Sequence, residues 1–456
     1  MAPYAGAFQG GFQFDDVSTI LENPHLDRWG TFVGHLHHMI RPVLYLTFFI
    51  DRFLYGDSAT GYHLLNLLLH LGCGILVYRI LLRAATEQTQ FVPFWVAVLF
   101  LIHPIATETV TYISGRASGL MAWWYLLALF FYVKTTECPR ENLTGRVYYA
   151  GAIASFLLSL ASKETAVTFP VVLLLWDLLV RRLNGAALRT AVRYDHLSFW
   201  LVLLIAGAIM WSHPRYTYLA QFSLDIRPPW DNALSQIHAV IYALLIFFEP
   251  WKLNLDHDLP VFHSLTQWPL PLDLMVLGVL AVTAFVAVRR LPLIAFGLGW
   301  FVLQLLPTNS VIPRLDLLSE RNLYLASIGI LLVTVLIGVY MTEWLNRVLR
   351  RPRIVPTAVG AVSLAFVVLL GLATNARNHL YHDAILLWSD AVNKSPGKAR
   401  PHNNLGHAYA ERGEWDLAIK EFRIALTLQP DYPLAQRICA TRIYGTWTGT
   451  NELSRA

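Results

Sequence analysis

The chain has 456 residues, of which 55% are hydrophobic and 14% are charged, and its mean hydropathy is +0.46. Soluble domains carry about 25% charged residues, so the composition excludes a soluble globular protein and indicates a polytopic membrane protein. The formal net charge of +5 is too small to indicate a nucleic-acid partner. Three cysteines give no disulfide framework.

Two adjacent carboxylates, Asp15 and Asp16, follow a Gly/aromatic run near the start of the chain and precede an almost wholly apolar sequence. Acids beside a membrane are costly unless they are solvated or paired, which makes both residues candidates for a functional site. The alternative is a solvated loop or a helix cap, because Asp is a favoured N-cap residue.

Ten segments are apolar enough to cross a membrane, although several fall short of the roughly 20 residues that a span needs. They are 61–80, 91–104, 117–133, 147–161, 166–180, 196–212, 271–288, 291–306, 322–341 and 355–374. Residues 41–56 are amphipathic and contain Asp51 and Arg52, which favours an interfacial helix. Residues 237–250 have no matching span before 271, so we expect an interfacial or re-entrant helix there.

Lysine and arginine gather in alternate loops, which are typical of the cytoplasmic side. These residues are Arg79, Arg83, Lys134, Arg140, Arg146, Arg181, Arg182, Arg189, Arg193, Arg289, Arg290, Arg347, Arg350, Arg351 and Arg353. The opposite loops hold most of the acids and histidines. We therefore expect Asp15, Asp16 and the whole C-terminus to lie outside the cytoplasm.

The chain becomes soluble in character after Ala399. Residues 402–436 match one tetratricopeptide (TPR) helix–turn–helix pattern. Residues 383–394 resemble the second helix of a preceding partial repeat, and 434–446 resemble a capping helix. Fewer than three repeats are rarely stable alone, so this unit should lean on the membrane domain. The expected domains are 1–60 with the acidic loop and interfacial helices, 61–376 in the membrane, and 377–456 with the TPR region.

Several polar residues lie within or beside the expected spans. His63, Asn66 and His70 share one helix face, which must turn away from lipid. Hydrogen bonding between helices is the favoured reading of this stripe over a catalytic role. His103, Glu108 and Arg116 fall in one short outer loop; a capped turn with a surface ion pair and a functional site both remain open.

Two further outer loops carry an acid beside a cation. Lys163 and Glu164 lie between two spans with almost no loop, which favours a mutual ion pair, with a phosphate-binding lysine as the alternative. Arg321 follows Glu320 at the start of a later span and can bind phosphate in a bidentate manner or pair with Glu320. Nucleotide-binding and HExxH motifs are absent from the sequence. The run His35, His37 and His38 is only a weak metal signal without cysteines nearby.

The ordered motifs FQFDD, RPVLYLTF, GYHLLNLLLH, FLIHPIATETVTYISGRASGL, LASKETAVTFPVVLLLWDLL, LLPTNSVIP with SERNLYL, and a final TPR resemble one known family. They are similar to those of the transmembrane and tetratricopeptide-repeat-containing O-mannosyltransferases, which are GT-C-type glycosyltransferases. The similarity runs from Phe12 to Asp431. It implies an all-α fold: a polytopic GT-C-like bundle with a short C-terminal TPR unit.

The resemblance implies inverting transfer of a sugar, by the family name mannose, from a polyprenyl-phosphate lipid to protein Ser/Thr hydroxyls. Asp15 would be the general base and Asp16 its neighbour, and cations would stabilise the leaving phosphate. The other expected substrate-contacting residues are Arg41, His63, His103, Glu108, Arg116, Lys163, Glu164, Glu320 and Arg321. No metal or other cofactor is expected to be obligatory. The acceptor protein is expected to bind with help from the TPR.

The resemblance has two departures. Family members begin with a span before the acidic loop, and Tyr4–Phe8 resembles only the end of that span. The TPR array is shorter than in animal enzymes, which fits a bacterial inner-membrane protein with a periplasmic site; an endoplasmic reticulum protein with a luminal site is the alternative. A membrane-anchored TPR scaffold without catalysis is the competing function, although it leaves the acids in the outer loops unexplained. A transporter is disfavoured because no repeat of halves is visible.

Overall fold

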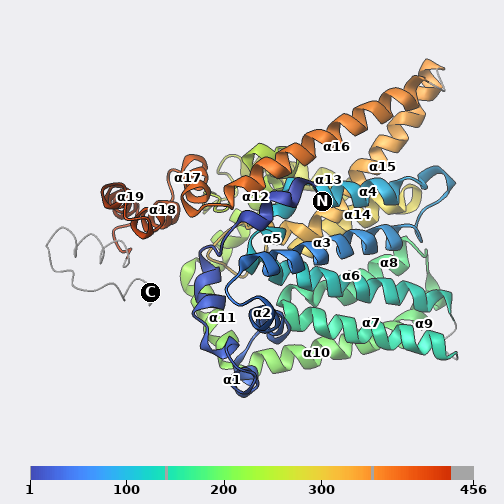
Figure 1. Cartoon of the computed structure of the whole chain (residues 1–456). Helices are drawn as coiled ribbons and strands as arrows, with labels where there is room; N and C mark the ends of the chain where they lie inside the picture. Colours follow the sequence, from blue (N-terminus) through green and yellow to red (C-terminus); the bar gives the residue numbers. More distant parts are fainter. Residues whose placement is uncertain (1, 139–141, 351–353, 433–456) are drawn as a thin grey trace.

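The computed structural model describes residues 2–138, 142–350 and 354–432, and these residues form helices, turns and loops without a strand. Long helices lie side by side in a bundle, and the C-terminal helices sit apart at one end of it (Figure 1). Within these described ranges, eight helices are long and apolar enough to cross a membrane, or up to nine if the bent pair Glu87–Ile102 and Pro104–Val110 counts as one span. The fold is therefore an all-α polytopic bundle, which confirms the predicted fold class.

The bundle helices follow the order expected from the sequence. They are α3 (Ala59–Leu81), α4 (Val92–Ile102), α6 (Arg116–Glu137), α7 (Leu143–Ser162), α8 (Phe169–Leu179), α9 (Gly185–Ala191), α10 (Leu197–Ser212), α13 (Leu270–Arg290), α14 (Pro292–Leu305), α15 (Leu323–Leu349) and α16 (Ile354–Leu380). The expected spans 166–180 and 291–306 correspond to α8 and α14, which have only 11 and 14 residues. Both carry proline in the first turn, where its missing N–H is not needed.

Glycine lets α14 and α15 approach closely. A Cβ atom on Gly329 would lie 2.3 Å from the carbonyl oxygen of Gly297, so any larger residue would push the two helices apart. The indole of Trp300 is buried beside this contact and donates a hydrogen bond to the Leu325 carbonyl at 2.8 Å. This contact fixes the start of α15, where several of the candidate site residues lie.

We call the end of the bundle that carries Asp15 and Asp16 the outer end; it lies to the left in Figure 1. Shorter elements cover it: α1 (Trp29–His35), α2 (Pro42–Tyr55), α5 (Thr107–Val110) and α11 (Pro214–Ile226). The helix α2 covers nearly all of segment 41–56, for which an interfacial helix was predicted. It ends at Gly56, whose φ of +59° is rarely adopted by residues other than glycine.

The helix α12 (Pro229–Phe248) is 20 residues long, which exceeds the short segment expected at 237–250. Its length and composition would allow it to span. Both of its ends nevertheless contact outer-end loops: Asn232 donates to the Ser310 carbonyl at 2.7 Å, and the Phe247 carbonyl lies 3.1 Å from Nε2 of His103. The chain therefore enters and leaves α12 on the same side, as expected for a helix that does not cross.

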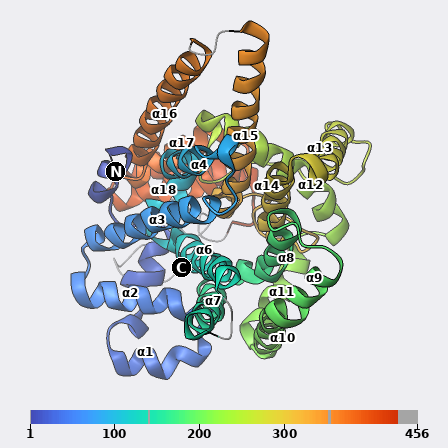
Figure 2. The ribbon, with the colours of Figure 1, turned by 90° about the vertical axis from the view of Figure 1, so that its right-hand side faces the viewer.

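The C-terminal helices are α17 (Ala384–Lys394), α18 (Ala399–Glu411) and α19 (Trp415–Leu428). Figure 2 views the molecule from the end opposite the outer end, and α17 and α18 lie behind the bundle in this view. A turn with Gly413 at φ +81° joins α18 to α19, and Phe422 packs close to Gly406 across the pair. The helix–turn–helix expected from the sequence is present. The capping helix expected at 434–446 lies outside the described residues.

An ion-pair network attaches this group to the membrane domain. Arg400 at the start of α18 binds both oxygens of the buried Asp256 and also Asp316, and Lys398 contacts the same two carboxylates. Lys394 donates to the Leu253 carbonyl at 2.8 Å. The C-terminal helices thus lean on the outer loops, as the small number of repeats suggested.

Candidate active site

The acidic loop connects the 3-10 helix Ala2–Gln9 to the short helix Val17–Leu21 at the outer end. Asp16 is fully buried in it and accepts hydrogen bonds from the backbone N–H of Gln13 at 2.9 Å and of Ser114 at 2.8 Å, and from the Ser114 hydroxyl. Burial raises the pKa of Asp16 to about 7 even though these bonds act to lower it. Asp16 therefore ties the loop to the start of α6.

Asp15 is in a different situation from its neighbour. Its backbone N–H donates to the Tyr112 hydroxyl at 3.2 Å. Its half-buried carboxylate accepts no hydrogen bond from any residue that the structure describes. Arg321 is close enough to interact with it electrostatically. Asp15 thus retains its full capacity to accept a proton or hydrogen bond from a bound molecule.

Phe14 holds an uncommon backbone conformation immediately before Asp15. Its φ is +44°, in the left-handed region that bulky residues rarely adopt. The side chain is 49% exposed, and its ring meets the ring of Trp388 in α17 edge to face with centroids 5.4 Å apart. A strained conformation of this kind persists only where its surroundings hold it, and such residues concentrate at functional sites.

Four cations gather at the outer end: Arg41, Arg314 and Arg321 all act electrostatically on Lys163. The guanidinium of Arg41 binds the Glu164 carboxylate in a bidentate manner at 2.9–3.1 Å, and Arg314 lies 3.9 Å from the same carboxylate. Burial alone would raise the pKa of Glu164, but Arg41 and Lys163 lower it to about 2. Glu164 therefore stays ionised and holds two arginines in place.

Arg321 is oriented by a buried carboxylate. Its backbone N–H donates to Oε2 of Glu108 at 2.8 Å, and its Nε lies 3.5 Å from Oε1 and donates to the Ser319 hydroxyl at 3.1 Å. No hydrogen bond of its two terminal nitrogens occurs within the described parts of the chain. The guanidinium is about one-third exposed. It remains available for an anion.

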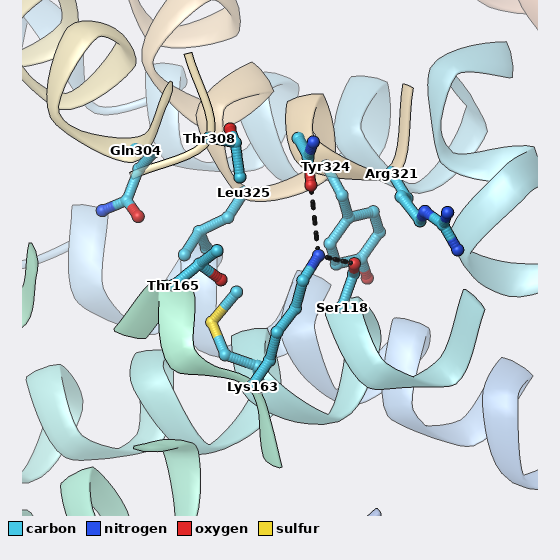
Figure 3. A pocket seen from close by; sticks show the side chains of 10 residues that line it. Ser118, Lys163, Thr165, Gln304, Thr308, Arg321, Tyr324 and Leu325 are labelled. Atoms are coloured by element: carbon cyan, nitrogen blue, oxygen red, sulfur yellow. Dashed lines mark hydrogen bonds between the residues drawn. The ribbon is translucent and has the colours of Figure 1, made fainter. Parts of the chain in front are cut away.

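Lys163 projects into a small cavity at the outer end of α7, lined in part by Ser118, Thr165, Arg321 and Tyr324 (Figure 3). Its Nζ donates to the Ser118 hydroxyl at 2.8 Å and to the Asn322 side-chain oxygen at 3.1 Å. An ammonium has three N–H groups, so one is left for a ligand. Burial, followed by the positive charges of Arg41 and Arg321, lowers the pKa of Lys163 to about 7.

Three of the predicted site residues have internal partners that favour a structural role. Nε2 of His63 lies 3.2 Å from the Gly10 carbonyl. Nδ1 of His103 accepts from the Ile105 N–H and its Nε2 donates to the Phe247 carbonyl, so both nitrogens are in use. Arg116 is wholly buried and bonds Asp51, Asn66, Thr47 and the Tyr62 carbonyl. These partners favour a structural role for Arg116 over the substrate contact expected from the sequence.

The favoured ion pair Lys163–Glu164 and the alternative pair Glu320–Arg321 are both replaced by other contacts. Glu320 pairs with Arg377 at 2.6 Å and accepts from Asn254 and His257, whereas Arg321 contacts Glu108. Lys163 and Glu164 turn to different partners, the lysine to Ser118 and Asn322 and the glutamate to Arg41 and Arg314. Adjacent residues at a helix end point in different directions, so neighbours in sequence are poor partners there.

The structure also adds residues that the sequence analysis did not single out. Arg314 joins the cation cluster, and Ser114, Ser118, Tyr112 and Asn322 bind the acidic loop or Lys163. Arg314 directly follows the LLPTNSVIP motif and precedes SERNLYL, so its charge was a usable signal. Within the described residues, no group of three or more His, Cys, Asp or Glu side chains has a metal-binding arrangement.

The molecule is thus an integral membrane protein of the all-α class, and one end of its bundle carries a group of cations and a carboxylate without a hydrogen-bond partner among the described residues. It is similar over 94% of its length to protein O-mannosyl-transferase Tmtc3 of Drosophila melanogaster (28% identity, 54% of that protein) and to protein O-mannosyl-transferase F38B6.6 of Caenorhabditis elegans (23%, 61%). It is also similar to TMTC1 of Homo sapiens, with 25% identity over 95% of this chain and 54% of that protein.

The chain is a homologue of the TMTC protein O-mannosyl-transferases, which confirms the family resemblance of its motifs. It spans about half to three-fifths of the length of these curated relatives. No family model matches the chain. No solved structure matches it either.

Proposed function

We propose that this chain is a membrane mannosyltransferase that moves mannose from a polyprenyl-phosphate donor to Ser/Thr hydroxyls of proteins. The names of its relatives support mannosyl transfer to protein. The single observation that carries the chemistry is the Asp15 carboxylate, which has no hydrogen-bond partner among the described residues and lies near Arg321. Arg321 in turn acts electrostatically on Lys163, so the acid and the cations form one site.

In the proposed reaction, the acceptor oxygen attacks the anomeric carbon of mannose from the face opposite the phosphate. The carbon–oxygen bond to the phosphate breaks, the configuration inverts, and the hydroxyl proton passes to Asp15. A hydroxyl is a poor nucleophile near neutral pH, so a carboxylate within about 2.6–3.2 Å of it is needed as general base. Asp15 is the residue at this site that still has its acceptor capacity.

Negative charge develops on the phosphate as the bond breaks, and fixed cations stabilise it most effectively in a water-poor site. Lys163 would direct its remaining N–H to this phosphate, and Arg321 its terminal nitrogens. Arg41 and Arg314, held by Glu164, add to the positive potential. These cations would take the role that a divalent ion has in other transferases, so we propose transfer without an obligatory metal.

The outer end, with Asp15 and α17–α19, is proposed to face the periplasm or the lumen of the endoplasmic reticulum. This placement rests on the lysine- and arginine-rich loops at the opposite end. The acceptor protein would then approach Asp15 past the TPR-like helices, while the donor lipid would reach the cations from the membrane.

The substitution Asp15→Asn tests this function because it keeps the shape of the side chain and removes its basicity. Transfer to a Ser/Thr acceptor should fall by about 10²–10⁴-fold. Binding of the donor, measured as thermal stabilisation of the purified protein by polyprenyl-phosphate mannose, should persist. The matched control Asp16→Asn should cost less, because Asp16 contacts the loop and Ser114 rather than a substrate.

Two results would contradict the proposal in different ways. If Asp15→Asn keeps near-normal transfer and Asp16→Asn abolishes it, the roles within the pair are reversed. If neither substitution changes transfer, the enzyme function is wrong and a TPR scaffold function replaces it.

A further inference from the structure

A groove of about 340 Å³ lies between the acidic loop and the C-terminal helices. One wall is Gln13, two residues before Asp15. The other wall comes from the start of α17 and the end of α18: His382, Asp383, Ala384, Ile385, Ala408, Glu411 and Arg412. The groove thus joins the candidate active site to the TPR-like helices, although the two are far apart in sequence.

The walls of the groove are polar and offer both donors and acceptors. Gln13 Nε2 is 3.4 Å from the Tyr381 carbonyl, a contact at the limit for a hydrogen bond. Asp383 caps α17 by accepting from the Ile385 N–H at 2.7 Å and also pairs with Arg412. Arg412 and Glu411 are exposed on α18. A lining that offers both donors and acceptors suits a polypeptide, whose backbone presents an N–H and a C=O at each residue.

The size of the groove sets the kind of ligand. Binding pockets for small ligands span about 300–1,000 Å³, so this one has room for a short segment of chain and not for a folded domain. Its polar lining is a poor match for the apolar tail of a polyprenyl lipid. The ring contact between Phe14 and Trp388 holds the acidic loop against α17 beside the groove.

We propose that this groove binds the acceptor polypeptide as an extended segment that flanks the Ser/Thr to be modified. The proposal rests on the proposed function and adds to it where and how the acceptor is held. An extended chain advances about 3.3 Å per residue. A segment lying along the groove as far as Gln13 therefore delivers a hydroxyl to Asp15 a residue or two further along. Recognition would depend on the residues beside the modified one.

Two acceptors separate this binding from the chemistry: a long peptide with a central Thr, and a Thr tripeptide too short to fill the groove. Arg412→Gln removes a charge-assisted hydrogen-bond donor, which typically costs tenfold or more in affinity. We expect KM for the long peptide to rise about tenfold with kcat unchanged, and KM for the tripeptide to stay the same. Glu411→Gln should also raise KM for the long peptide, by a smaller factor.

Arg423→Gln is the matched control, because Arg423 is an exposed arginine of α19 outside the groove. It should change neither KM. Asp383 is left intact since it caps α17. As a second measurement, a long peptide with a photoreactive residue beside the Thr should crosslink to α17 or α18 of the unmodified protein.

The groove is not the acceptor site if Arg412→Gln changes KM equally for both peptides or for neither, with transfer continuing. Crosslinks formed only with other loops would rule it out as well. Failure of the unmodified protein to transfer sugar to either peptide would instead overturn the proposed function, and the groove assignment with it. The two failures are therefore distinguishable.

Discussion

Charged residues at the outer end fall into two regions that look alike in sequence and differ in their contacts. In the first, around Arg116 and Glu320, the charges are buried and ion-paired: Arg116 with Asp51, and Glu320 with Arg377 and His257. In the second, around Asp15, Lys163 and Arg321, the groups keep unused donors or acceptors.

The difference follows from the cost of burying charge. An ion taken out of water is tolerated when a partner and further hydrogen bonds replace its hydration, so the first region holds helices and loops together. A group with hydrogen-bonding capacity left over at the end of a membrane bundle is stable only if it faces water or a ligand. The second region is therefore where substrate contacts are expected, and the comparison can be tested by substitution in each region.

The largest expected effect is loss of stability in the first region. Arg116→Met leaves Asp51 buried without its partner at 2.6 Å, and breaking one side of such a pair costs about 3–5 kcal/mol. The double variant Arg116→Met/Asp51→Asn removes the unpaired charge and should recover part of this loss. Thermal unfolding of the detergent-solubilised protein measures both.

The comparison between the two regions would fail if Arg116→Met unfolded at the same temperature as the unmodified protein and instead lost donor binding. Arg116 would then contact substrate, as the sequence analysis expected.

Substitution of Lys163 should affect the reaction and leave the fold intact. Removing one preorganised donor to a developing negative charge typically slows a reaction by about 10²–10³-fold, and we expect this from Lys163→Met. The pKa of Lys163 is about 7, so the ammonium form is present below pH 7 and is lost as the pH rises above it. We therefore expect kcat/KM for sugar transfer to fall as the pH rises above about 7.

Lys163→Arg provides the matched control, because arginine stays charged throughout this range. The variant should keep part of the activity and lose the alkaline fall. A flat pH profile from 6 to 9 in the unmodified protein would show that the charge of Lys163 is not used in transfer.

The sequence predicted the helices well and the partners poorly. Long apolar segments and arginine-rich loops identify most spans, because each signal is contained within about 20 residues. The acidic pair, Lys163 and Arg321 were also visible as charges beside spans. What decides their roles is the set of contacts, such as Asp16 to Ser114 or Glu320 to Arg377, and these join residues 98 and 57 positions apart.

The smallest expected effect concerns Phe14, which links the second region, beside Asp15, to the C-terminal helices. Phe14→Gly introduces a residue that adopts a φ of +44° readily, and it removes the ring contact to Trp388. Such aromatic contacts are worth about 0.5–1.5 kcal/mol, so kcat should fall about threefold to tenfold as Asp15 becomes less well oriented, with donor affinity unchanged. Phe14→Tyr retains the ring and should restore kcat. If Phe14→Tyr is as slow as Phe14→Gly, or if both match the unmodified protein, the contact does not position Asp15, and the C-terminal helices act on acceptor binding alone.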